Sequence, residues 1–297
     1  MKIYNLGSLN LDYVYKVGHF VQPGETLSSK HYSCLPGGKG LNQSIAASRA
    51  GSKVYHIGII GEDAGLLTKT LLESNVNLNF LNITDAVCGH AIIQVNEDGE
   101  NCILLFGGSN RQISKKFIEH TFAQIDKESL LLLQNETNNL EYALYVAKQV
   151  GLSVMLNPSP IDDELLNLDL SAVSWLVLNE IEGRELTGEK EPNKILDNLL
   201  EKYPDMKVVL TLGCKGSIYR DRLKEVVQES YQVTVKDTTA AGDTFTGYFA
   251  SSLAEGKDVE VAMNLASKAA AITITKVGAA NSIPWMKEVV FDSCCLL

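Results

Sequence analysis

The stretch DTTAAGDTFTGYFA, residues 237–250, passes from polar residues through small ones to an acidic residue and then to apolar residues. This order predicts a helix that begins near Gly242 and buries its later turns. PGGKGLNQSIAASRAG, residues 36–51, has the same order of glycines, polar residues and apolar helix. A helix start presents unpaired backbone N–H groups and a partial positive charge, which suit a phosphate. We expect the two helix starts to face one cleft.

Outward from these stretches, short apolar runs typical of buried parallel strands recur along the chain. They lie at residues 3–6, 54–60, 130–133, 154–156, 175–178 and 208–212. Helical patterns separate many of them, and two long helices are expected beyond Gly242, at about 243–255 and 259–275. Alternation of strand and helix predicts an α/β fold, with a mostly parallel sheet covered by helices on both faces.

One segment departs from this alternation. GHAIIQVNEDGENCILLFGG, residues 89–108, contains two alternating strands around a polar turn at 97–100, which predicts a hairpin. Extended stretches at 13–17 and 27–35 come earlier in the chain. Such pieces form a small extension from a parallel sheet, and the pattern is equally compatible with a lid over a cleft and with an edge that has no part in binding.

Composition limits the classes of partner. The 297 residues are enough for one large α/β domain or for two domains. A net charge of −10 argues against nucleic acid or an anionic membrane surface as a partner. The six cysteines show no zinc-ligand spacing, and neither a signal peptide nor a membrane-spanning run is evident, so reduced thiols and a cytoplasmic protein are expected.

Asp243 is the candidate catalytic group of the second helix start. The small residues Ala240, Ala241 and Gly242 let a phosphate approach closely, and Asp243 could accept a proton from an attacking hydroxyl. The alternative is that Asp243 only caps the helix. Neither GGKGLN nor GCKGS has the spacing of a P-loop, and no G-x-G-x-x-G follows the first strand. The residues by themselves therefore indicate an α/β enzyme with an anion site near Gly242.

The two stretches together resemble the signature patterns of the ribokinase-type, pfkB-like family of carbohydrate kinases. The resemblance extends in chain order over nearly the whole sequence, through GSLNLD, PGET, NEDGEN, LNPSP, NEIE, TLGCKG and VGAANSIPW. It implies one kinase domain over residues 1–297, folded as a three-layer sandwich with a small β lid formed by about 11–35 and 88–108. It also implies ATP-dependent phosphorylation of a small sugar-like alcohol.

The resemblance assigns roles to individual residues. Asp243 matches the family's catalytic base, and the backbone N–H groups of Ala241, Gly242 and Asp243 match its anion hole. The positions that match sugar contacts are Asn10, Asp12, Gly38, Lys39, Asn42 and Glu136. Taken singly, Lys39 could be a surface amine, Asn42 a helix cap and Glu136 a loop charge.

The resemblance also implies nucleotide and ion sites. Asn179 and Glu182 match an N-x-x-E element that acts near Mg²⁺ and the triphosphate, largely through water. The positions implied to line the nucleotide are Asn179, Thr211, Gly213, Gly216, Ala240, Gly242 and Ser267, the last where the family commonly has Asn or His near adenine. Two loops of a K⁺ site, built mostly from backbone carbonyls, contain Asp237, Thr239, Lys276, Gly278 and Ser282.

Within the family, Lys39 together with Asn10, Asp12 and Asn42 favours D-ribose, phosphorylated at its 5-hydroxyl. Deoxyribose, fructose or a pseudouridine-like nucleoside are the alternative substrates, and a non-catalytic sugar-binding regulator is the alternative class. An intact Asp243 and N-x-x-E element argue against the regulator, and the missing glycine fingerprint argues against a dinucleotide oxidoreductase. The resemblance further implies a homodimer that pairs through the lid.

Overall fold

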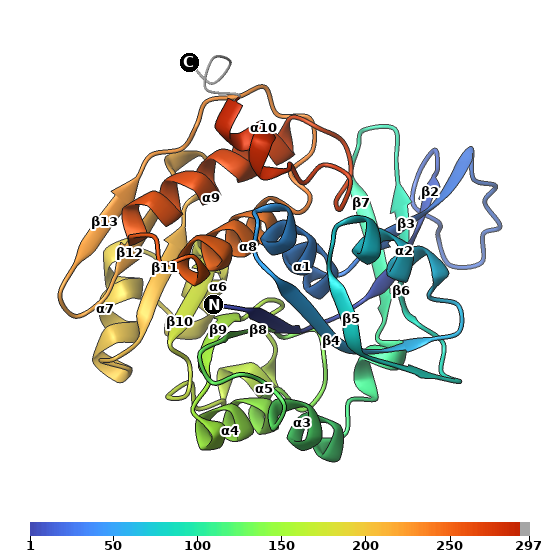
Figure 1. The fold of residues 1–297 in the computed structure, drawn as a ribbon. Coiled ribbons are helices and arrows are strands. Elements are labelled where there is room, and N and C mark those ends of the chain that lie inside the picture. Colours follow the sequence, from blue (N-terminus) through green and yellow to red (C-terminus); the bar gives the residue numbers. More distant parts are fainter. Residues whose placement is uncertain (292–297) are drawn as a thin grey trace.

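The computed structural model describes residues 1–291, and its central feature is a nine-stranded sheet in the order β13-β12-β11-β10-β9-β8-β1-β4-β5 (Figure 1). The strands from β11 to β5 in this order pair in parallel, whereas β12 and β13 form an antiparallel edge. The strands are β1 (Ile3–Leu6), β4 (Val54–Gly61), β5 (Asn77–Thr84), β8 (Leu130–Gln134), β9 (Ser153–Asn157), β10 (Trp175–Asn179), β11 (Lys207–Thr211), β12 (Ser217–Arg220) and β13 (Glu225–Gln228).

Two hydrophobic cores lie on opposite faces of this sheet because side chains alternate along each strand. Ile3 of β1 joins one core and the next residue, Tyr4, joins the other. Val209 and Val208 of β11 divide in the same way. Strands that are buried on both faces read as continuous apolar runs, which is why the sequence predicts them correctly.

Helices cover both faces, as the alternation predicts (Figure 1). The helices that pack on the face of Ile3 are α1 (Lys39–Arg49), α2 (Gly65–Glu73), α8 (Ala241–Ala254), α9 (Val259–Ile274) and α10 (Met286–Phe291). The helices that pack on the face of Tyr4 are α3 (Lys115–Phe122), α4 (Leu140–Val150), α5 (Asp163–Leu166), α6 (Glu180–Thr187) and α7 (Pro192–Lys202). Two short 3₁₀ turns, η1 (Gly108–Arg111) and η2 (Gly213–Lys215), are also present.

A second, four-stranded sheet projects from one end of the molecule in the order β3-β2-β6-β7, and we call it the lid (Figure 1). Its strands are β2 (Asn10–Lys16), β3 (His31–Gly37), β6 (Gly89–Val95) and β7 (Asn101–Phe106). The expected hairpin of residues 89–108 is confirmed, because β6 and β7 pair antiparallel. Strands β2 and β6 pair in parallel, so the hairpin joins the early extended stretches in one sheet.

Three features differ from the sequence expectation or lie beyond it. Strand β5 carries polar side chains and is half-exposed along its length, so it shows no apolar run that would predict it. The edge hairpin of β12 and β13 is missed for a similar reason, since Glu225 and Val227 of β13 are exposed. The extended stretch expected at 27–35 begins only at His31.

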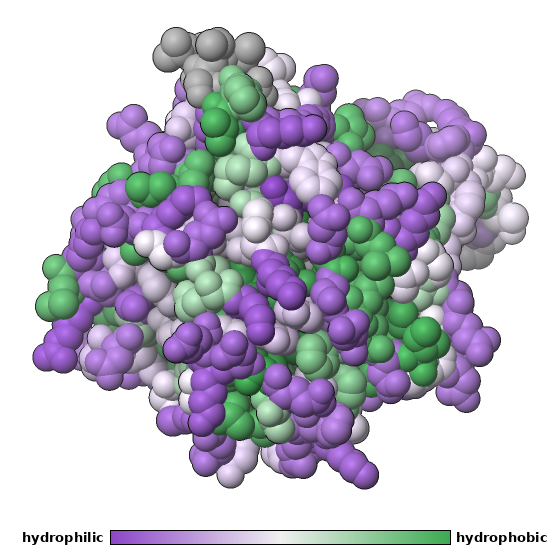
Figure 2. Space-filling model, viewed as in Figure 1, coloured by the Kyte–Doolittle hydropathy of each residue, from purple (hydrophilic) through white to green (hydrophobic). Residues whose placement is uncertain are grey.

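The surface is mostly hydrophilic on the face seen in Figure 2, and hydrophobic residues gather toward the side of α2 and β5. Leu72 and Ile83 are exposed on these two elements. The free cysteines of the described residues are Cys34, Cys88, Cys102 and Cys214, while Cys294 and Cys295 lie outside those residues. No helix within residues 1–291 is long and apolar enough to cross a membrane.

Candidate active site

The start of α8 is built by three small residues. Ala240 precedes the helix in the left-handed region, with φ 62°, and its carbonyl accepts the first helical hydrogen bond from the Thr244 N–H at 2.8 Å. A side chain at Gly242 would meet no atom within 4 Å, so open space lies beside the first turn of the helix. The first N–H groups of a helix have no partner within it, and here they border that space. The Ala241 N–H makes one long contact of 3.3 Å to the Thr238 carbonyl.

Asp243 meets the start of α1, so the two helix starts face one another as expected. The Asn42 amide donates to Asp243 Oδ2 at 3.0 Å, and the Gln43 amide donates to Asp243 Oδ1 at 2.9 Å. Asp243 is only 7% exposed. Asn42 Oδ1 is buried without a hydrogen-bond partner, a costly state that a hydroxyl donor from a ligand would relieve.

The start of α1 is itself held against the end of β1. Gly40 lies so close to Gly7 and Ser8 that a side chain there would come within 2.4 Å of the Ser8 nitrogen. A glycine is required for this approach. Glu136, which follows β8, accepts hydrogen bonds from the Lys39 N–H at 2.9 Å and from the Ser8 hydroxyl. Three segments distant in sequence therefore converge where Gly38 leads into α1.

Lys39 supplies the positive charge of the site. Burial lowers the pKa of its ammonium, but the carboxylates of Asp243, Glu136 and Glu182 raise it by more, so the net pKa lies above the ordinary value. The side chain therefore stays charged at neutral pH. A buried cation near three carboxylates is suited to an anionic group such as a phosphoryl group.

Asp12 lies on β2 of the lid. Burial and then the neighbouring Glu136 raise the pKa of its carboxyl group to about 7. Because the folded-state pKa is above the unfolded value, the free protein loses stability as the pH rises from about 4 to about 7. Nearby, Asn10 Oδ1 accepts a hydrogen bond of 2.8 Å from the Asn110 amide, which fixes the orientation of Asn10.

A cavity of about 230 Å³ lies between the two helix starts and the ends of β9, β10 and β11. The sequence-predicted residues that line it are Lys39, Asn179, Glu182, Thr211, Ala240, Ala241, Gly242 and Asp243. The predicted nucleotide residues Gly213, Gly216 and Ser267 do not line it, and neither do the predicted sugar contacts Asn10, Asp12, Gly38, Asn42 and Glu136. The backbone explains why residue 216 is a glycine: its φ is 94°, and a side chain would come within 2.0 Å of the Gln228 carbonyl oxygen. Ser267 lies on α9 and is half-buried.

Asn179 and Glu182 form a capping box at the start of α6. Asn179 Oδ1 accepts from the Glu182 N–H at 2.9 Å, and Glu182 Oε2 accepts from the Asn179 N–H at 3.0 Å. The cap fixes both side chains at the wall of the cavity. Amide and carboxylate oxygens are the hard donors that suit Mg²⁺ and its bound water, so these residues fit the ion that the sequence implies.

The two loops expected to hold a monovalent cation are joined by Asp237. Its Oδ1 accepts from the Thr239 N–H at 2.9 Å, and its Oδ2 accepts from the Gly278 N–H, also at 2.9 Å. Burial raises the pKa of Asp237, but these bonds and one from the Thr239 hydroxyl lower it by more. The net pKa is below the ordinary value, so the carboxylate stays charged. Lys276 pairs instead with Glu288 at 2.8 Å, and the Ser282 hydroxyl donates to the Ala279 carbonyl.

Several residues of the site were not singled out from the sequence. Gln43, Asn157 and Thr238 lie within the quoted motifs GGKGLNQ, LNPSP and DTT, so the signal was present but no role was attached to them. Ser8 likewise lies in GSLNLD. Asn110 lies outside every quoted motif, and only the pairing of the hairpin with β2 brings it to Asn10.

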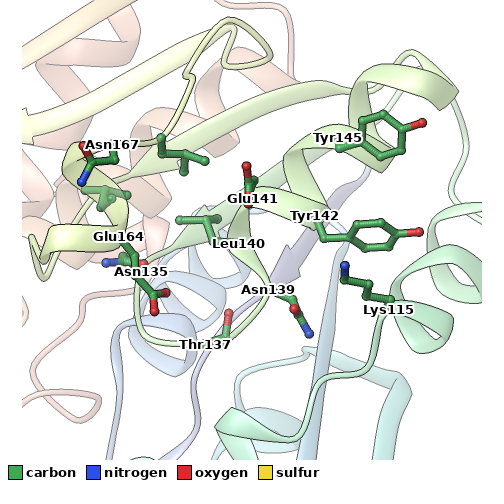
Figure 3. A pocket seen from close by; sticks show the side chains of 12 residues that line it. Lys115, Asn135, Thr137, Asn139, Leu140, Glu141, Tyr142, Tyr145, Glu164 and Asn167 are labelled. Atoms are coloured by element: carbon green, nitrogen blue, oxygen red, sulfur yellow. The ribbon is translucent and has the colours of Figure 1, made fainter.

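A larger cavity of about 740 Å³ lies elsewhere, between α3, α4 and α5 (Figure 3). Asn135 and Thr137, which flank Glu136, line it together with Glu141 and Tyr142. The Lys115 ammonium lies 4.7 Å from the centre of the Tyr142 ring, and the Asn135 amide donates to the Pro160 carbonyl at 2.7 Å. This cavity contains neither helix start nor Asp243, so the smaller cavity is the candidate active site.

Comparison with known proteins finds a matching family model and relatives over nearly the full length of the chain. The model of the pfkB family of carbohydrate kinases matches residues 2–286. The chain is similar to the ribokinase of Haemophilus influenzae, with 37% identity over 296 residues that cover 95% of each protein. Both helix starts and the whole lid fall within the matched range.

Two solved structures share the fold over nearly their full length. Ribokinase from Cryptococcus neoformans var. grubii, in complex with ADP, matches with a TM-score of 0.85 and 31% identity, covering 97% of this chain and 98% of that one. Ribokinase from Arabidopsis thaliana, complexed with ribose and ATP, matches with a TM-score of 0.85 and 28% identity, covering 97% of each chain.

Proposed function

The chain belongs to the pfkB family of carbohydrate kinases and is an ATP-dependent sugar kinase, and from this premise we propose that its sugar is D-ribose, phosphorylated at the 5-hydroxyl. The observation that carries the proposal is the meeting of Asp243 with Asn42 at two facing helix starts. The proposed base Asp243, the unpaired Oδ1 of Asn42 and the first N–H groups of α8 lie close together there. The presence of ribokinases among the similar proteins, one of them complexed with ribose and ATP, supports ribose as the sugar of this chain.

In the proposed reaction the 5-hydroxyl oxygen attacks the γ-phosphorus of ATP. A new O–P bond forms, the bond from phosphorus to the bridging oxygen of ADP breaks, and the hydroxyl proton passes to Asp243. The N–H groups of Ala241, Gly242 and Asp243 stabilise the negative charge that develops on the transferring group. Lys39, whose ammonium is held between carboxylates, approaches the same group from α1.

The sugar would lie between α1 and the lid. Asp12 and Asn10 would offer oxygens from β2, Asn42 its unpaired Oδ1, and Gly38 its backbone. Glu136 holds Ser8 and the Lys39 backbone in place and faces the same side. An ADP-release assay over pentoses, hexoses and nucleosides tests the assignment. Ribose should give the highest kcat/KM, and a higher value for any nucleoside or hexose would contradict it.

Mg²⁺ and K⁺ are part of the proposal. Asn179 and Glu182 would hold the hydrated Mg²⁺ of the nucleotide, and that ion, when bound, neutralises part of the phosphate charge. The loops joined by Asp237 would hold a monovalent cation, because its charged carboxylate bonds both loops next to the start of α8. Ala240 and Ala241 follow Thr239 directly, so an ion bound there would steady the anion hole.

Replacing K⁺ by Na⁺ or Tris at constant ionic strength is expected to lower kcat severalfold. The reason is that the loop of residues 237–241 would lose an ion that holds its carbonyls together. The steady-state rate of ADP release at saturating ribose and ATP measures the effect. Equal rates in all three buffers would show that no monovalent cation acts here.

We also propose that two copies of the chain pair through the lid. The strand register places Leu35, Ala91 and Leu105 in one row with Asp12, and Ile103 in the next row on the same face. Leu35, Ile103 and Leu105 are 36%, 56% and 51% exposed. A twofold axis would bring the same apolar face of two copies into contact, so each copy would cover the exposed side chains of the other.

Leu105→Glu is therefore expected to convert a dimer to a monomer, because it puts a charge at the centre of the paired faces. Sedimentation equilibrium measures the mass. Leu104→Glu is the matched control, since Leu104 is 68% exposed but points to the opposite face of β7. A wild-type monomer, or dimers in both variants, would refute pairing through this face.

A further inference from the structure

We propose that Gln43 is a positioning residue for catalysis: held by Gln134, its amide fixes the Asp243 carboxylate so that Oδ2 receives the proton of the sugar hydroxyl. The inference rests on the proposed role of Asp243 as the base. It concerns side chains that point away from the sugar, into the space between α1 and the sheet. Gln43 is fully buried, and Gln134 is 1% exposed.

The contacts of Gln43 leave its amide only one orientation. Its Nε2 donates to Asp243 Oδ1 at 2.9 Å and to Asn157 Oδ1 at 3.1 Å, and its Oε1 accepts from Gln134 Nε2 at 2.7 Å. A carboxylate only accepts hydrogen bonds, so the nitrogen of Gln43 must face Asp243. Both amide hydrogens and the amide oxygen are then in use. The side chain has no second arrangement of similar energy.

Gln134 is fixed in turn by the centre of the sheet. Its Nε2 donates to both Gln43 Oε1 and Asn5 Oδ1, the second at 3.0 Å. Turning this amide over would set its oxygen against those two acceptors. The observed orientation leaves Gln134 Oε1 buried without a partner, which is a cost that the two donated bonds must outweigh. The bond to Gln43 is thus directed toward Asp243 by the surrounding protein.

Behind Asn5, the chain of hydrogen bonds ends on backbone carbonyls. The Asn5 amide donates to the Gly40 carbonyl and to Ser44 Oγ, both at 2.8 Å. The Ser44 hydroxyl then donates to His56 Nδ1, and His56 Nε2 donates to the Gly7 carbonyl. Burial lowers the pKa of His56 to about 4, so the ring is neutral and can accept at Nδ1. Every link therefore has a fixed donor and a fixed acceptor, and the network is rigid.

The two amides on Asp243 have different tasks. Asn42 has an unpaired Oδ1 beside its bond to Asp243 Oδ2, so it can exchange that bond for one to an arriving hydroxyl. Gln43 faces the interior and keeps Oδ1 occupied throughout turnover. The carboxylate thus cannot rotate its second oxygen away from the attacking hydroxyl. Positioning of this kind contributes to kcat rather than to sugar binding.

Gln43→Met tests the inference, because Met has a similar length and keeps the packing but cannot hydrogen-bond in this way. We expect kcat to fall about ten- to hundredfold, the loss typical of one hydrogen bond to a charged group. The KM for ribose should change less than about threefold. The acid limb of the kcat–pH profile should move to higher pH, since the carboxylate loses a bond that favours its charged form.

The pH readout separates positioning from a merely structural role. Lys39 is the cation that faces Asp243, and Glu136 and Glu182 act on Lys39 in the same site. None of these three groups changes in Gln43→Met. Gln134→Met is a second variant one bond further from the base, and kcat should fall by about three- to tenfold with the same direction of pH shift. Ser48→Ala, also buried on α1, is the control and should behave as wild type.

Two results would overturn the inference. One is a Gln43→Met enzyme with kcat within about twofold of wild type. The other is a parallel loss of kcat and thermal stability in both variants with an unshifted pH profile, which would make the network structural only. If Gln43→Met does not fold, Gln134→Met decides by the same criteria. Turnover by Asp243→Asn would instead show that the base itself is wrongly assigned, whereas an inactive Asp243→Asn beside a normal Gln43→Met would reject only the role of Gln43.

Discussion

Asp243→Asn is expected to lower kcat by at least about a hundredfold while ribose and ATP still bind with nearly normal affinity. The loss follows because an amide cannot take the proton of the attacking hydroxyl, and a general base typically contributes a factor of this size or more. Steady-state kinetics by ADP release give kcat, and calorimetric titration gives the two affinities. Asp243 makes no capping hydrogen bond at the start of α8, where Ala240 is the N-cap, so the measurement tests its role as the base directly.

The site can accommodate this substitution without unfolding. The new amide can turn its oxygen toward Gln43, which only donates at that point, and its nitrogen toward Asn42. Asn42 can then turn over and accept with the oxygen that is unpaired in the free protein. Asp162→Asn is the matched control, because Asp162 caps α5 by accepting from the Leu165 N–H at 2.9 Å. A near-normal kcat in Asp243→Asn would reject Asp243 as the base.

Asp12→Ala is expected to remove most of the preference for D-ribose over 2-deoxyribose. Wild type should prefer ribose clearly in kcat/KM, because a site built to bind a hydroxyl is left with an unpaired buried group when the hydroxyl is missing. Loss of one charged hydrogen bond should cost ribose about 1.5–3 kcal/mol in the variant. The kcat/KM values of both sugars with both proteins measure the change.

The control for Asp12→Ala is Asp98→Ala, which removes a carboxylate from the exposed turn between β6 and β7 and should keep the preference. Stability supplies a second readout. The pKa of Asp12 near 7 destabilises the free protein above that pH by at most about 4 kcal/mol, and partial exposure of the side chain reduces the figure. Asp12→Ala should therefore unfold at a higher temperature than wild type at pH 8. Equal use of both sugars by wild type, or an unchanged preference in the variant, would show that Asp12 does not bind the 2-hydroxyl. The assignment of ribose as the substrate would then be refuted as well.

The local order of residues determined much of this molecule. Apolar runs predicted six strands of the sheet, because a strand covered on both faces is mostly apolar along its length. The glycine-led stretches predicted where α1 and α8 begin, since small residues and a carboxylate at a helix start are local features. The residues alone indicated an anion site near Gly242, and the resemblance to the family's signature patterns added Lys39 to the same candidate site.

Tertiary structure alone decided how these local pieces meet. The contact of Asn42 with Asp243 spans 201 residues and that of Ser8 with Glu136 spans 128, so neither leaves a periodic signal in the sequence. The strand order sets both contacts by bringing β1 next to β8, with α1 packed against α8. Strand β5 and the edge hairpin escaped prediction because their half-exposed side chains need no apolar pattern. The orientation of Gln43 likewise follows only from which acceptors surround it, because hydrogen-bond direction is set by neighbours in space and not by neighbours in sequence.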